Sequence, residues 1–115
     1  MAITEAYTGT AAISATEFSA PNNTTYSAAS VIAVAGVYQV FLDVNDLALA
    51  DNLRIRIYEK CRSGDTVRVI SESFILGTGI TTWVSPSLVL MNGWDVTFYA
   101  SAGTVTVLWS IRKVA

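Results

Sequence analysis

The densest group of charged side chains lies in residues 51–72, where arginines alternate with apolar residues. Its basic members are Arg54, Arg56, Lys60, Arg62 and Arg68, and its acidic members are Asp51, Glu59, Asp65 and Glu72. Arginines on one side of a strand could bind phosphate or a partner's carboxylates, with a tyrosine as a stacking surface. The segment carries a net charge of only +1, however, so we expect no nucleic-acid binding.

Two interpretations of this segment remain open. It could be the solvated face of an ordinary strand, or it could be a protein interface, where arginine and tyrosine are favoured. The residues of the possible partner interface are Arg54, Arg56, Tyr58 and Arg68.

Residues that could perform catalysis are scarce. The chain has no histidine, which excludes the Ser-His-Asp triad, the Cys-His pair and histidine-ligated metal sites. Its single cysteine, Cys61, cannot form an internal disulfide and has no accompanying base, so we expect a partly exposed, inert thiol. We therefore predict no enzyme activity, no catalytic residues, no cofactor and no metal site.

Two other groups of residues could bind ligands. The acidic link Asp43-Val44-Asn45-Asp46, with Asp51 after it, could offer oxygen ligands to calcium, but turn roles for Asp and Asn explain it more simply. Trp94 and Trp109 alternate in phase with apolar residues and are expected in the core. Trp83 is expected to be partly exposed, and with exposed Tyr58 and Tyr99 it would favour a carbohydrate-binding or adhesin module as the alternative function.

The composition suits one domain of 115 residues. Hydrophobic residues make up 52% and charged residues 14%, and the net charge is −2. This indicates a well-filled core, a surface partly covered by partners, or both. The first residues lack the features of a signal peptide, and the longest uncharged run, 18–42, is too polar for a membrane helix. We expect a soluble protein that is made in a cytoplasm and binds no membrane.

Short stretches of alternating apolar and polar residues recur at about ten-residue spacing. They are 37–44, 53–60, 66–75, 80–91, 94–100 and 104–111. Pro86 interrupts the fourth stretch and predicts an edge position or a bulge. Residues 62–65 and 100–103 are typical of hairpin turns, and the link 45–52 could carry one helical turn.

This pattern predicts an all-β fold, a single-domain antiparallel β-sandwich of about 7–8 strands, with jelly-roll and immunoglobulin-like topologies both open. Residues 1–30 are expected to form an N-terminal arm or weak strands, and residues 31–115 the sandwich core, in one domain overall.

The register of the 53–74 hairpin can be predicted from its apolar residues, because a one-residue slip inverts every side chain. Paired numbers that sum to an even value place Leu53, Ile55 and Ile57 on one face with Val67, Val69 and Ser71. The opposite face then holds Arg54, Arg56, Tyr58 and Lys60 with Arg68, Ile70 and Glu72. Glu72 would lie across from Arg54 or Arg56.

Three stretches of the chain resemble a group of small proteins encoded in tailed-phage genomes. They are GVYQVFLDVNDLALADNLRIRIYEKCRSGD, WVSPSLVLMNGWDVTFYA and the terminal WSIRKVA, and the resemblance covers about residues 36–115. It implies a phage structural protein, most specifically a capsid decoration or cement protein that binds and stabilises the shell of the major capsid protein. It further implies a location on the capsid surface, synthesis in the host cytoplasm, and a homo-oligomer, trimer or dimer.

Overall fold

The strands of the protein form two antiparallel sheets. The computed structural model describes residues 3–45, 52–76, 81–101 and 103–114. The strands are β1 (Ile3–Ile13), β2 (Phe18–Ser19), β3 (Thr24–Thr25), β4 (Gly36–Asp43), β5 (Asn52–Lys60), β6 (Val67–Leu76), β7 (Thr82–Val84), β8 (Leu88–Leu90), β9 (Trp94–Ala100) and β10 (Val105–Val114). A short 3₁₀ turn, η1 (Ala28–Ser30), precedes β4. No helix in these ranges is long and apolar enough to cross a membrane.

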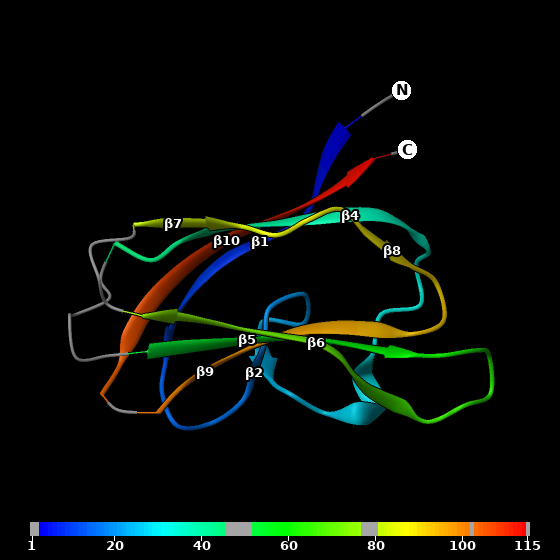
Figure 1. The fold of residues 1–115 in the computed structure, drawn as a ribbon, viewed down its shortest axis with the longest axis horizontal. Coiled ribbons are helices and arrows are strands. Elements are labelled where there is room, and N and C mark those ends of the chain that lie inside the picture. The colour runs from blue at the N-terminus through cyan, green and yellow to red at the C-terminus, as the bar shows by residue number, and fades with distance from the viewer. Residues whose placement is uncertain (1–2, 46–51, 77–80, 102, 115) are drawn as a thin grey trace.

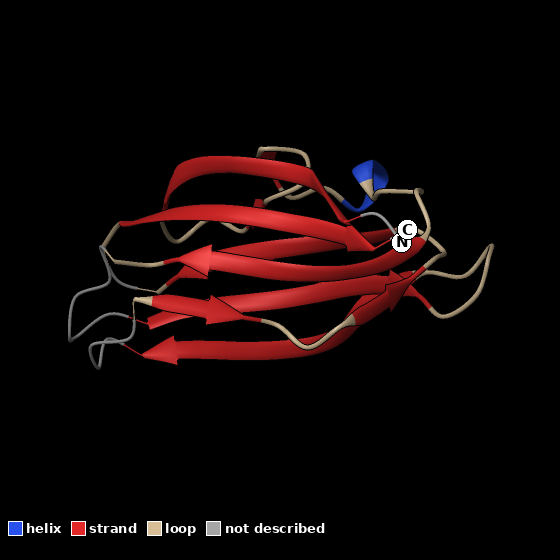
Figure 2. Cartoon of the chain, turned by 90° about the horizontal axis from the view of Figure 1, so that it is seen from above, coloured by secondary structure: helices blue, strands red, loops and turns tan. Residues whose placement is uncertain are grey.

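The first sheet has the order β1-β10-β4-β7, with β8 also paired to β4, and the second has the order β3-β2-β9-β5-β6. Figure 1 shows the sheets as two facing layers with the start of β1 beside the end of β10, and Figure 2 shows the strands of the layered sheets from above. The Cα radius of gyration is 13.7 Å, close to the value of about 13 Å expected for a compact domain of this length. The predicted β-sandwich is confirmed. It has more strands than predicted, because β2 and β3 are very short and the 80–91 stretch divides into β7 and β8.

The core lies between the sheets and follows the predicted alternation. The inward residues of β4, Tyr38, Val40 and Leu42, are buried. Trp94 and Trp109 are buried as predicted, and the ring centroids of Tyr38 and Trp94 lie 4.5 Å apart. These large rings, together with the buried aliphatic side chains around them, form the apolar contact that holds the two layers together.

Trp109 also explains a glycine in the edge strand β1. Gly9 pairs with Trp109 in the β1–β10 ladder. A Cβ atom at Gly9 would lie 2.5 Å from Cζ2 of the Trp109 ring. The tryptophan therefore occupies the space that a side chain at this position would need.

The β5–β6 hairpin has the predicted register over only part of its length. Leu53 pairs with Ile75 and Arg56 with Glu72, so the even sum is confirmed there. Between Ile57 and Tyr58 the register shifts, and Tyr58 pairs with Val69. The prediction for this end was wrong because a β-bulge leaves Ile70 without a partner on β5. Val69 and Ile70 are both exposed, with relative accessibilities of 42% and 53%.

Two predicted connections differ in outcome. Residues 62–65 lie in a β-hairpin connection, as predicted. The 100–103 segment does not join a hairpin, because β9 belongs to the second sheet and β10 to the first.

Pro86 lies between β7 and β8 at the edge of the first sheet, as its missing N–H requires. The Ser85 hydroxyl there accepts the Val40 N–H at 2.9 Å. It takes the place of the backbone carbonyl that would accept this N–H from β4 in a regular sheet. The helical turn considered for 45–52 falls almost entirely outside the described residues.

The N-terminal third contributes to both sheets. β1 pairs with β10 along its whole length at one edge of the first sheet. β2 then pairs with β9 in the second sheet, and β3 pairs with β2. Ile32 adds a further bridge to Trp94. Residues 17–32, called here the covering segment, thus lie beside β9 and over part of the outer face of the second sheet.

Candidate functional site

The structure separates the four residues of the predicted interface. Arg54 and Arg56 project from the outer face of β5, because their neighbours Leu53, Ile55 and Ile57 point into the core. Tyr58 belongs to the same row but is only 7% exposed. Arg68 lies beyond the β-bulge on β6 and is exposed.

Arg54 is held in place by contacts on two sides. Its guanidinium carbon lies 4.4 Å from the centre of the Tyr99 ring, a cation–π contact. Nη2 lies 3.8 Å from Oε2 of Glu17, and the Arg54 side chain is 19% exposed. Arg54 is therefore a packed residue, unlike a freely solvated arginine.

Arg56 forms the predicted pair with Glu72. Nε donates to Oε2 at 2.6 Å across the β5–β6 ladder. The side chains are 29% and 37% exposed. The charges of both β5 arginines are thus matched by carboxylates of the same chain, which leaves little net field for binding a free anion.

Tyr58 is buried because the covering segment lies on it. Its hydroxyl donates to Oε2 of Glu17 at 2.6 Å, and its ring stacks on Tyr26 with centroids 4.5 Å apart. Thr97 also donates to the same Glu17 oxygen, at 2.6 Å. The pKa of Tyr26 is raised to about 12, mainly by burial and to a smaller extent by electrostatic repulsion from Tyr58, Asp95 and Glu17.

A second carboxylate, Asp95, lies under the covering segment and is fully buried. Oδ1 accepts from the Ser19 hydroxyl at 2.7 Å and from the Val96 N–H at 2.8 Å. Oδ2 is buried and has no hydrogen-bond partner in the described part of the chain. Burial raises the pKa of Asp95 to about 6, the two hydrogen bonds to Oδ1 oppose this, and Glu17 adds to it.

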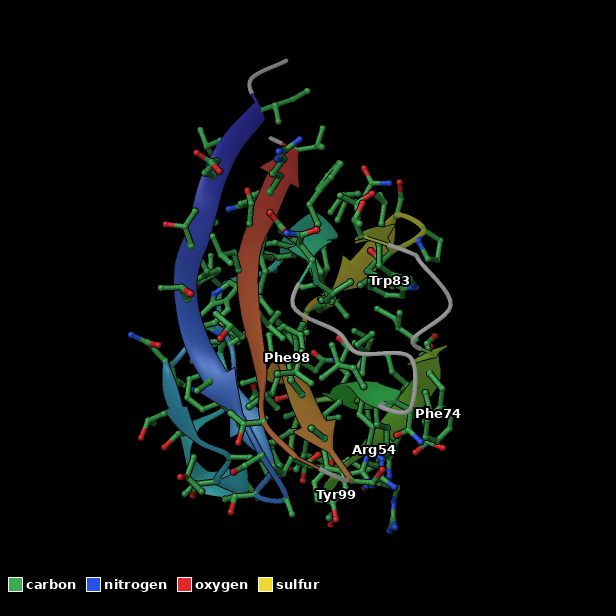
Figure 3. The ribbon with its side chains drawn as sticks, turned by 90° about the vertical axis from the view of Figure 1, so that its left-hand side faces the viewer. Arg54, Phe74, Trp83, Phe98 and Tyr99 are labelled. Carbon is green, nitrogen blue, oxygen red and sulfur yellow. The ribbon has the colours of Figure 1, made fainter. Side chains whose placement is uncertain are left out.

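The uncovered end of the outer face combines the arginine pairs with apolar side chains. Phe74 pairs with Arg54 in the ladder and is 57% exposed. Figure 3 shows Arg54, Tyr99 and Phe74 together at this end of the second sheet. We call the following residues the outer patch: Arg54, Arg56, Glu72, Phe74 and Tyr99. Val69 and Ile70 extend its apolar part along the edge strand β6.

Sequence reasoning missed several residues of this region. Phe74 falls on the same face as Glu72 by period-two alternation, but its exposure could not be predicted, because nothing in the sequence says that this end of the face is left uncovered. Glu17 and Asp95 were missed because their contacts depend on the covering segment, whose strands are only two residues long.

The aromatic residues considered for sugar binding do not share a surface. Trp83 pairs with Leu42 and packs against the core from β7, in the first sheet. Tyr58 is covered by Tyr26, and one side of Tyr99 is covered by Arg54. Figure 3 shows Trp83 well away from Tyr99.

The remaining candidates have simple structural roles. Oδ1 of Asp43 accepts the Asn45 N–H at 3.0 Å, the turn role that was expected for this link. No group of three or more acidic or cysteine side chains that could hold a metal occurs among the described residues. Cys61 is exposed and unpaired.

The chain was compared with family models and with curated proteins. No family model matches the chain. No curated protein matches it either.

Proposed function

We propose that this chain is a non-catalytic structural protein of a tailed-phage virion, a capsid decoration protein that binds the major capsid protein through the outer patch. The observation that carries this proposal is the combination of exposed Phe74 with two internally paired arginines on a rigid sheet. The resemblance of residues 36–115 to small tailed-phage proteins supports the choice of partner.

The composition of the outer patch suits a protein interface. Arginine, tyrosine and phenylalanine are enriched at interface centres. Docking removes charges from water, which is costly for an unpaired ion. Because Arg54 and Arg56 each already face a carboxylate, a neutral partner surface could cover them without leaving an unpaired charge.

The edge strand β6 would contact the partner through its side chains. An unpaired edge strand is normally a template for another strand. The bulge at Ile70 interrupts the regular backbone of β6, a device that opposes such pairing. Val69, Ile70 and Phe74 are left as apolar contacts for docking.

Several further properties belong to this proposal. The protein would act at the capsid surface after synthesis in the host cytoplasm, as a dimer or trimer, without cofactor. Symmetric homo-oligomers are common, and repeated copies match the repeated sites of a capsid shell. A net charge of −2 gives no long-range attraction to nucleic acid.

Co-sedimentation of the purified protein with capsid shells that lack it tests the proposal. Phe74→Ser should weaken binding at least tenfold and leave the melting temperature unchanged, since the side chain is 57% exposed. Val89→Ser is the matched control, because Val89 is a 76% exposed apolar residue on β8 in the other sheet. Equal binding of the two variants would contradict the assignment of the outer patch.

A carbohydrate-binding module is the alternative and has less support. Its three candidate aromatics lie on different surfaces or under other side chains, as described above. A glycan array would favour this alternative if it found a ligand while capsids bound no protein.

A further inference from the structure

The outer face of the first sheet contains a hollow of about 310 Å³. Three adjacent strands, β10, β4 and β7, line it. Its outward side chains are Phe41, Asp43, Thr82, Val84, Leu108, Ser110 and Arg112. Val84 and Leu108 are about half exposed, so the hollow offers apolar surface to a ligand.

Arg112, on β10, lies at one end of this hollow. The guanidinium carbon of Arg112 lies 3.7 Å from the centre of the Phe41 ring. Nε donates to the Ser110 hydroxyl at 3.2 Å, and that hydroxyl donates to Glu5 at 2.6 Å. Within the described ranges, no carboxylate lies within 4.0 Å of Arg112. The Nη atoms therefore keep donors free for a carboxylate from outside.

A carboxylate marks the other end. Asp43 is exposed, and its Oδ1 accepts the Asn45 N–H; among the described residues Oδ2 accepts no hydrogen bond. Phe41, which carries the guanidinium, and Asp43 are two residues apart on β4, so their Cα atoms are separated along the strand by about 7 Å. This is also the length of about two residues of extended peptide.

We propose that the hollow binds the C-terminal end of an extended peptide, with the free carboxylate on Arg112 and a backbone N–H two residues upstream directed at Asp43. An apolar side chain between them would contact Phe41, Val84 and Leu108. The opposite charges at the two ends match the polarity of a peptide terminus. They oppose a ligand with anionic groups at both ends.

This site lies on the opposite sheet from the outer patch and does not depend on the proposed function. Capsid binding through Phe74 and peptide binding through Arg112 can therefore fail separately.

A titration followed by ¹H–¹⁵N NMR tests the site with the probe acetyl-Ala-Leu-Val bearing a free carboxylate. The expected result is a saturable shift of the Phe41, Leu108 and Ser110 amide signals, with a Kd in the millimolar range, on the order of 1 mM. The same peptide with a C-terminal amide should bind at least tenfold more weakly, because the charge-assisted bonds to Arg112 are lost. This comparison needs no protein variant.

Two variants and a control locate the contacts. Arg112→Gln should weaken binding of the acid peptide about tenfold, and Asp43→Asn about threefold. Arg68→Gln, which changes an exposed arginine on the other sheet, should leave the affinity unchanged. Circular dichroism checks that each variant is folded.

Three results would overturn the inference. One is equal affinity for the acid and amide peptides, and another is the absence of signal shifts up to about 20 mM peptide. The third is hexanoate binding as tightly as the peptide, since a simple carboxylate has no N–H for Asp43.

Discussion

The Tyr58 hydroxyl donates to the Glu17 carboxylate at 2.6 Å, and this hydrogen bond joins the second sheet to the segment that covers it. The same carboxylate also accepts from Thr97 and lies near Arg54. One end of the outer face is therefore internal structure, while the other end, with Phe74, remains open. This division decides which residues should affect stability and which should affect binding.

Removal of the Tyr58 hydroxyl should destabilise the protein. Tyr58→Phe leaves the ring stacked on Tyr26 but removes a largely buried donor to Glu17, at a cost of about 1 kcal/mol. Tyr99→Phe is the control, because the Tyr99 hydroxyl has no hydrogen bond in the described part of the chain and its removal should change little. Urea denaturation measures both. Equal effects would mean that the Glu17 contact does not stabilise the covering segment.

The two β5 arginines should differ in their contribution to stability. Arg56→Ala removes an exposed pair and should cost less than about 1 kcal/mol. Arg54→Ala removes the packed aliphatic part of the side chain and the cation–π contact with Tyr99. It should lower the free energy of unfolding by about 1–2 kcal/mol. If both arginines lay on a fully solvated strand face, thermal stability would be nearly unchanged in both variants. Thermal denaturation distinguishes the two accounts, and an unaffected Arg54→Ala variant would contradict this one.

Asp95 should make the protein less stable as the pH rises. Its folded-state pKa of about 6 lies above the ordinary value of 3.8, so the folded chain binds the proton more tightly than the unfolded chain. The stability from this group is fully present below about pH 4 and is lost as the pH rises through 6. At about 1.4 kcal/mol for each pH unit, the loss is at most about 3 kcal/mol.

Asp95→Asn removes that loss while keeping an oxygen for Ser19. We expect the variant to melt at a higher temperature than the wild type at pH 7.5, and the difference to shrink at pH 4.5. The other carboxylates of the chain are unchanged in the variant, so only the part of the pH dependence that comes from Asp95 should disappear. A variant that is less stable than the wild type at pH 7.5 would show that ionised Asp95 does not destabilise the folded protein.

A side chain at Gly9 should disturb the packing of Trp109. Gly9→Ala places a Cβ atom 2.5 Å from the indole ring, and the expected loss is about 1–3 kcal/mol. The direction of the change in stability is informative, because alanine normally stabilises a strand relative to glycine. Chemical denaturation, followed by tryptophan fluorescence, measures the effect. A neutral or stabilising substitution would mean that Trp109 can move away from β1.

The sequence predicted those strands in which apolar and polar residues alternate strictly. The inward faces of β4, β5 and β10 are as expected, because each alternation spans a whole strand with one buried side. β6 deviates, since a bulge shifts its register and an edge position leaves Val69 exposed. Neither feature leaves a signal in a single sequence.

The candidate site was less predictable than the fold. The Arg56–Glu72 pair follows from the register alone, so it was predicted. The burial of Tyr58, Asp95 and Thr97 was not, because it depends on a segment distant in sequence. Period-two patterning identifies the two faces of a strand, but it does not say what covers the outer face.

The central claim is that the outer patch of the second sheet attaches this protein to a capsid shell. A cryo-EM map of the virion or of a reconstituted capsid tests it most directly. The account predicts density for the sandwich at many symmetry-equivalent positions on the shell, with Phe74 and the β5–β6 face against the major capsid protein. Density at a single tail-tip location, or a capsid contact made by the first sheet alone, would contradict it.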